Sequence, residues 1–181
     1  MSTTTYVTDA VSLSTGLLLA RLIVGVLMAA HGAAKLSHWF GGYGIAGTAP
    51  FFEQLGFRPG RLFVITASLS EVVGGILVAL GLFGPVGPAL ILSVMIVAAV
   101  SVHWGHGLFA GTNGIEVPLL YAAGAVAVAL TGPGLFSLDV VLGIDHIWTP
   151  AFKVAAVAVG AVGGVLNLLA RRRSAAVAAT A

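Results

Sequence analysis

Five long runs of apolar residues, separated by short segments rich in glycine, proline and polar residues, dominate this 181-residue chain. They lie at about 16–36, 61–83, 86–104, 115–131 and 151–170. A helix needs about 20 mostly apolar residues to cross the hydrocarbon core of a bilayer. The run at 115–131 is a little shorter than that, and the other four are long enough. We therefore predict an all-α polytopic membrane helix bundle.

The composition excludes a water-soluble domain. Hydrophobic residues make up 59% of the chain and charged residues 8%, with a mean hydropathy of +1.08, whereas soluble domains carry about 25% charged residues. The net charge of +2 comes from scattered basic residues, so we do not expect nucleic-acid binding. Because there is no cysteine, the chain has no disulfides, thiolate metal sites or thiol chemistry of its own.

The distribution of Lys and Arg predicts the orientation. Arginines at 171–173 follow the last apolar run, and Lys35, Arg58 and Arg61 flank the segment between the first and second runs. If all five runs cross the membrane, these basic residues lie on one side of it and Lys153 lies on the other. Cytoplasmic segments carry the excess of positive charge. The pattern favours an outside N-terminus and a cytoplasmic C-terminus in a bacterial inner membrane.

The segment between the first two runs predicts a short helix lying in the membrane interface. Thr48 is a candidate N-cap, Pro50 would fall in the first turn, and Gly56 would end the helix. The aromatic and aliphatic side chains of this segment would then lie at the level of the lipid headgroups.

Glu71 is a carboxylate near the middle of the second run. It shares a helical face with small residues, namely Ala67, Ser68, Gly74 and Gly75, which mark close approach of another membrane helix. The first run carries a matching stripe of Arg21, Gly25, Met28, Gly32 and Lys35. We predict an intramembrane ion pair between Glu71 and Arg21, with Lys35 as the alternative partner. A structural lock, a protonated Glu71 and a functional site all remain open.

Further polar residues gather at the predicted cytoplasmic ends of the runs. Together with Glu71, the ligand-binding candidates are His31, Lys35, His103, His106, Asn113 and Glu116. Imidazoles beside a carboxylate can move protons, ligate a metal or hydrogen-bond a quinone carbonyl. The alternatives are interfacial anchors, and a helix capping box formed by Asn113 and Glu116. No ligand spacing supports haem or a metal, and no catalytic residue can be assigned.

Several blocks together resemble the DoxX family of small bacterial membrane proteins. They are "LLLARLIVGVLMAAHGAAKL", "SEVVGGILVALGLF", "GTNGIEVPLLY" and "GPGLFSLD". The resemblance implies a four-helix membrane bundle over 16–139, preceded by a short tail at 1–15. A loop at 140–150, an additional fifth span at 151–170 and a basic, alanine-rich tail at 171–181 would follow. The family's polar positions fall on Arg21, His31, Gly32, Lys35, Glu71, Asn113 and Glu116.

The same resemblance implies association with redox chemistry. Some relatives are subunits of thiosulfate:quinone oxidoreductases, and others belong to membrane complexes handling oxidative and thiol stress beside soluble enzymes. We therefore expect a redox-associated membrane subunit that binds quinone or a similar amphipathic ligand. If it is catalytic, it would be a quinone-linked oxidoreductase subunit acting with a partner. A non-catalytic scaffold docking soluble redox enzymes is the alternative, and a transporter is disfavoured because no inverted repeat is present. Gly160 and Gly164 permit close helix packing within the chain or in a homo-oligomer.

Overall fold

The computed structural model describes residues 3–172, so the predicted tail from Arg173 onward lies outside the described residues. The described chain is all-α, without strands. Its long helices are α1 (Thr3–Leu36), α3 (Gly60–Leu80), α4 (Val86–Ala98), α5 (Glu116–Thr131) and α7 (Pro150–Leu169), and the shorter ones are α2 (Gly44–Gln54) and α6 (Leu138–Val141). The predicted helical class is confirmed.

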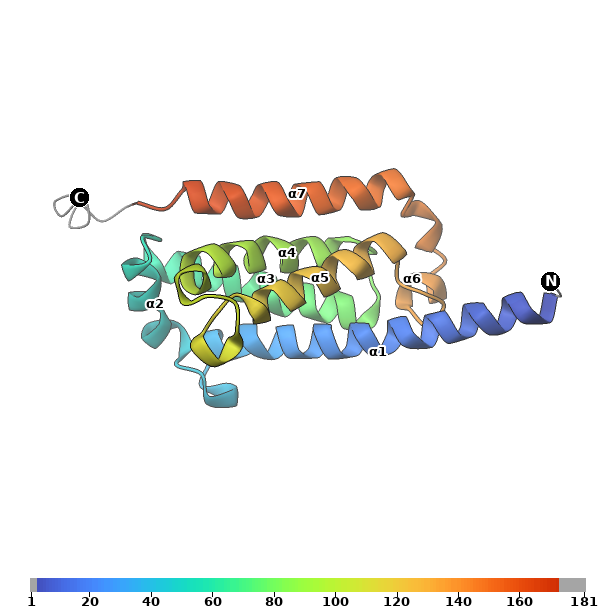
Figure 1. The fold of residues 1–181 in the computed structure, drawn as a ribbon, viewed down its shortest axis with the longest axis horizontal. Helices are drawn as coiled ribbons and strands as arrows, with labels where there is room; N and C mark the ends of the chain where they lie inside the picture. The colour runs from blue at the N-terminus through green and yellow to red at the C-terminus, as the bar shows by residue number, and fades with distance from the viewer. Residues whose placement is uncertain (1–2, 173–181) are drawn as a thin grey trace.

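Four segments of the described chain are long and apolar enough to cross a membrane: α1, α3, α7, and α4 with its continuation to His106. With 16 residues, α5 is shorter. Consecutive long helices run in opposite directions (Figure 1). The N-terminal end of α1 and the C-terminal end of α7 lie at opposite ends of the bundle. The molecule is thus a multi-pass membrane bundle, with α2 at one end and α6 at the other.

The first helix begins much earlier than the apolar pattern indicates. The sequence predicts a tail over 1–15, but α1 is helical from Thr3, since neither proline nor glycine interrupts the chain before Gly16. At 1.5 Å per residue, its 34 residues extend about 51 Å, well beyond the roughly 30 Å hydrocarbon core. Figure 1 shows its N-terminal turns projecting past the other helices.

Helices α1 and α3 pack against each other through the predicted glycine stripes. A Cβ on Gly25 would come within 2.5 Å of the Gly75 carbonyl oxygen, and a Cβ on Gly32 within 2.6 Å of the Ser68 carbonyl oxygen. Only glycine permits such an approach of two membrane helices. The two contacts also set the register, which buries Glu71 in the interface at 3% exposure.

The short helix predicted between the first two spans is present as α2 but starts earlier than predicted. It begins at Gly44, so Thr48 is inside the helix and donates its hydroxyl hydrogen to the Gly44 carbonyl (2.8 Å) instead of capping it. Pro50 also lies inside the helix and not in its first turn as predicted; it lacks a backbone donor there, and its ring crowds the carbonyl four residues earlier. The predicted end at Gly56 agrees with the structure, because Gly56 has a φ of +95° that favours glycine.

Candidate functional site

The buried carboxylate of Glu71 pairs with Lys35. The Lys35 ammonium donates to Glu71 Oε2, with Glu71 3% exposed and the Lys35 side chain 29% exposed. The predicted pair between Arg21 and Glu71 is absent. Side chains on a helix lean toward its N-terminus. Because α1 and α3 are antiparallel, the side chains of Lys35 and Glu71 lean toward each other along the helix axis. The side chain of Arg21 leans away from Glu71.

Arg21 instead belongs to a second buried cluster, at the α6 end of the bundle. Its guanidinium, 1% exposed, donates to the Phe136 carbonyl and lies against Gly81, where any Cβ would collide with it. The fully buried carboxylate of Asp139 is close enough to attract the Arg21 charge. Arg21 therefore holds together the loop that follows α5 and the turn that ends α3.

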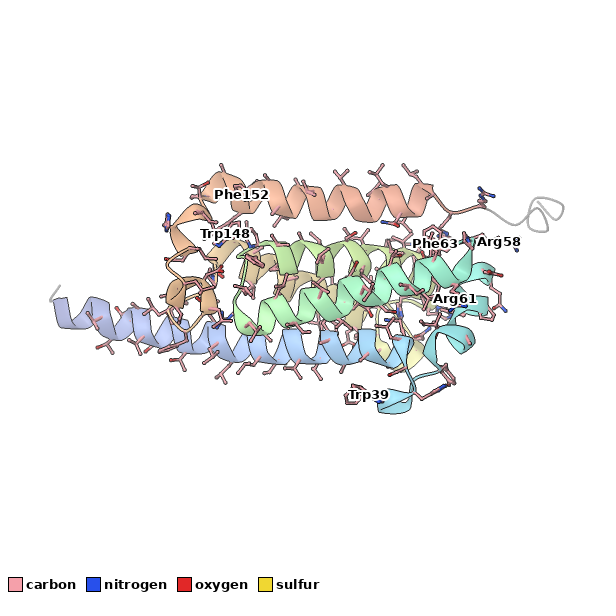
Figure 2. All side chains as sticks on the ribbon, turned by 180° about the vertical axis from the view of Figure 1, so that it is seen from behind. Trp39, Arg58, Arg61, Phe63, Trp148 and Phe152 are labelled. Atoms are coloured by element: carbon pink, nitrogen blue, oxygen red, sulfur yellow. The ribbon has the colours of Figure 1, made fainter. Side chains whose placement is uncertain are left out.

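Asp139 organises this cluster through three accepted hydrogen bonds. The donors are the backbone N–H groups of Phe83 (2.8 Å) and Gly84 (2.7 Å) and the indole Nε1–H of Trp148 (2.8 Å). Trp148 and its neighbour Phe152 mark this end of the bundle in Figure 2. All three donors belong to the protein itself, so this cluster stabilises the fold at the α6 end of the bundle.

The Lys35–Glu71 pair, in contrast, borders a cavity of about 330 Å³. Helices α1, α3, α4 and α5 enclose it, α2 covers it with aromatic side chains, and Asn167 of α7 reaches it. A volume of this size falls within the range of small-molecule sites. Its apolar and aromatic lining consists chiefly of Met28, Phe51, Phe52, Leu55, Phe57, Phe63, Val94, Met95, Val97, Val102, Val117 and Pro118.

Hydrogen-bonding groups gather on one part of the cavity wall. His31 and Tyr121 meet edge to face, with ring centroids 5.8 Å apart, and both line the cavity beside Lys35 and Glu71. His103 also lines it. Its Nδ1 donates to the Asn113 carbonyl oxygen (2.8 Å), because a carbonyl only accepts, so neutral His103 carries its acceptor at Nε2.

A short π-helix, Ala99–His103, continues α4 at this wall. Such insertions are rare and frequently occur at functional sites. Ser101, Val102 and His103 from this segment line the cavity, and the buried Ser101 hydroxyl has no hydrogen-bond partner within residues 3–172. An unpaired buried hydroxyl costs free energy. A ligand could satisfy it.

The structure divides the predicted cluster. His31, Lys35, Glu71 and His103 line the cavity, whereas His106, Asn113 and Glu116 do not. His106 Nδ1 donates to the Val102 carbonyl (3.0 Å). His106 and Asn113 lie in the segment between α4 and α5, and Glu116 is the first residue of α5.

The predicted capping box is wrong. Asn113 has a left-handed φ of +64° and precedes the helix, while Glu116 is its first residue. The Glu116 carboxylate accepts from the Ala110 backbone N–H at 2.7 Å. This bond joins the first residue of α5 to the loop that precedes it.

The cavity residues that were not predicted as site residues include Ser101, Tyr121, Asn167 and the buried aromatic Phe57. Tyr121 carries a signal that could have revealed it, since it is the only residue with a polar ring in an otherwise apolar run. Phe57 gives no such signal, because its position depends on how the loop after α2 folds back.

The arrangement suits an uncharged or zwitterionic molecule with an apolar body and a hydrogen-bonding end. Lys35, His31 and Tyr121 supply donors, and Glu71 and His103 supply acceptors. Within residues 3–172, no group of three or more His, Cys, Asp or Glu residues is placed to hold a metal ion. The side chains of this wall can form hydrogen bonds and transfer protons.

Comparison with known protein families matches residues 16–104 to the DoxX family. No curated protein and no solved structure matches the chain. The matched region contains α3, α4 and most of α1, with Lys35, Glu71 and the π-helix, while the apolar helix α7 lies beyond it. The protein is therefore a multi-pass membrane protein that carries a DoxX family domain over residues 16–104.

Proposed function

We propose that this protein is a membrane subunit of a redox complex and binds a quinone, or a similar amphipathic molecule, in the cavity beside Lys35 and Glu71. One observation carries the proposal: a buried ion pair faces a cavity whose remaining wall is mostly apolar and aromatic. Ion pairs that serve packing alone need no adjoining cavity. An isoprenoid-bearing ring would find both donors for its carbonyl oxygens and apolar surface for its body.

The side chains of the site divide the work of binding and proton transfer. Lys35 and His31 donate hydrogen bonds to a carbonyl oxygen, and Tyr121 adds a third donor from α5. Glu71 holds or releases a proton while Lys35 offsets its charge. Electrons enter from a soluble redox partner, since the chain has no cysteine to exchange them itself.

Replacing Glu71 by glutamine or His31 by alanine is expected to reduce the quinone that copurifies with the protein several-fold, because a hydrogen bond contributes about 0.5–1.5 kcal/mol, and about 1.5–3 kcal/mol when one group is charged. Quinone is extracted from purified protein and quantified by mass spectrometry. His106→Ala is the matched control, because His106 is exposed and does not line the cavity. Equal quinone content in wild type, both site variants and the control would refute the site.

We further propose that the cavity end of the bundle faces the cytoplasm. This end carries Arg58 and Arg61, both visible beside Phe63 in Figure 2, as well as Lys35 and the last residues of α7. The positive-inside rule places such a concentration of basic residues in the cytoplasm. The α6 end then faces outward.

The orientation can be read from single cysteines, because the chain has none of its own. In intact spheroplasts, a membrane-impermeant maleimide is expected to label Asp145→Cys, at the α6 end, at least about tenfold faster than Gly111→Cys, in the loop before α5, because an intact bilayer keeps the charged reagent from the cytoplasmic side. Both positions are exposed. Disrupting the membrane should make the two rates similar. The reverse preference in intact spheroplasts would overturn the orientation.

A further inference from the structure

Arg171 and Arg172, which directly follow α7, make a set of contacts with the segment that follows α2. The Arg172 backbone N–H donates to the Gly56 carbonyl at 2.9 Å, and Arg171 Nε–H donates to the Leu55 carbonyl at 3.0 Å. The Arg171 guanidinium also lies over the Phe57 ring, 5.7 Å from its centroid. Three contacts of different kinds thus join the end of the last helix to the three residues 55–57.

These same residues form a wall of the cavity. Leu55 and Phe57 line it, and Phe57 is 2% exposed. The Phe57 ring lies 5.2 Å from that of Phe63 and 6.1 Å from that of Phe52. The aromatic side chains therefore form a continuous layer, which we call the aromatic wall, made of Phe52, Phe57 and Phe63.

The backbone conformation at Gly56 lets the chain end after α7 pack closely against the loop after α2. Gly56 adopts a φ of +95°, and a Cβ there would come within 2.7 Å of the Arg172 carbonyl oxygen. The loop thus leaves room for the chain end that passes over it. One turn before the contact, Asn167 of α7 lines the cavity directly.

We propose that Arg171 is a positioning residue that holds the aromatic wall closed over the cavity, so that α7, beyond the DoxX domain, completes the site. The inference rests on the proposed function for the nature of the ligand, but the closure of the cavity does not depend on it. A guanidinium can hold a carbonyl and a ring face at once, whereas an ammonium cannot reproduce that planar geometry. Arg171 therefore has a role distinct from that of a topogenic charge.

The first test measures access to the cavity without any ligand. Ser101→Cys introduces a thiol at the cavity wall of a chain without cysteines. Its reaction with N-ethylmaleimide is timed in the background of Arg171→Met and of Arg172→Met. The two arginines are neighbours of equal charge, but only the Arg171 side chain contacts the segment after α2, since Arg172 uses its backbone.

We expect Arg171→Met to raise the labelling rate at position 101 about tenfold and Arg172→Met to leave it unchanged, with Arg171→Lys in between. Ser14→Cys, a buried position in the distal part of α1 (5% exposed), should keep its rate in every background. Equal rates at position 101 in the two methionine variants would overturn the proposal. So would a parallel rise at position 14, which would show general loosening of the bundle.

Gly56→Ala supplies a second route that leaves the Arg171 side chain intact. The added methyl group displaces the end of α7, so labelling at position 101 should again rise, whereas Gly105→Ala, with open space around its Cβ position, should not change it. Unchanged labelling in Gly56→Ala would contradict the proposal.

The second test uses ubiquinone-1 as the probe and measures its dissociation rate from purified protein. Arg171→Met should release the probe about tenfold faster than Arg172→Met. If wild type binds no probe while labelling still separates the two variants, the closing role of Arg171 stands and the proposed quinone function fails. If the probe binds but dissociates equally from both variants, Arg171 does not position the site.

Discussion

Lys35→Met is expected to lower the free energy of unfolding by about 3 kcal/mol. Breaking a buried pair by removing one partner typically costs 3–5 kcal/mol, and the lower end applies because Lys35 is itself 29% exposed. The cost arises from Glu71, which would be left at 3% exposure without a counter-charge. Unfolding of the purified protein in mixed micelles, titrated with denaturing detergent, measures the change.

The double variant Lys35→Met with Glu71→Leu separates a charge effect from a packing effect. Replacing both partners by apolar residues is often neutral or stabilising, so the double variant should recover most of the loss. Lys153→Met is the control, because Lys153, the only other lysine in the sequence, makes just a long contact (3.4 Å) with the Thr131 carbonyl. If Lys35→Met behaves like Lys153→Met, the pair does not stabilise the bundle.

Asp139→Ala is expected to cost a similar amount, about 3–5 kcal/mol, at the opposite end of the molecule. The substitution removes the acceptor of three hydrogen bonds and leaves the guanidinium of Arg21 without its nearby carboxylate. Trp148 would lose its bond to Asp139, so its fluorescence should shift together with the loss of stability. The readout is again the detergent titration.

Asp145→Ala is the matched control for this end, because Asp145 is exposed in the same connection between α6 and α7. It should change the free energy of unfolding by no more than about 0.5 kcal/mol. An Asp139→Ala variant as stable as this control would show that the buried cluster does not stabilise the fold. The cavity should keep its ligand in Asp139→Ala protein that remains folded, because the two clusters lie at opposite ends of the bundle.

The helices and their neighbours could largely be predicted. Apolar length gave the spans, and the small residues beside Glu71 indicated which faces of α1 and α3 meet. Gly25 and Gly75 confirm that expectation by the closeness of their backbones. The early start of α1 was missed because its first turns are polar enough to resemble a tail, although nothing in them breaks a helix.

The candidate site could be predicted only in part. The sequence placed two cations on the correct face of α1 but could not choose between Arg21 and Lys35 as the partner of Glu71. The choice depends on the register of two antiparallel helices and on the direction in which their side chains lean. Glu116 shows the same limit, since α5 starts two residues later than the capping box requires, and the Glu116 carboxylate then bonds to the preceding loop instead of capping the helix.

By itself, the sequence determined that the chain is a membrane protein, because a surface this apolar would not be stable in water. It also determined that the few charged side chains within the helices need partners inside the bundle. The tertiary structure alone decided which partners these are. It separated the polar residues into a hydrogen-bonded cluster around Asp139 and a cavity lined by Lys35 and Glu71. It also brought Arg171 against Phe57. Contacts between residues more than 100 positions apart depend on how whole helices pack, and no local pattern encodes that.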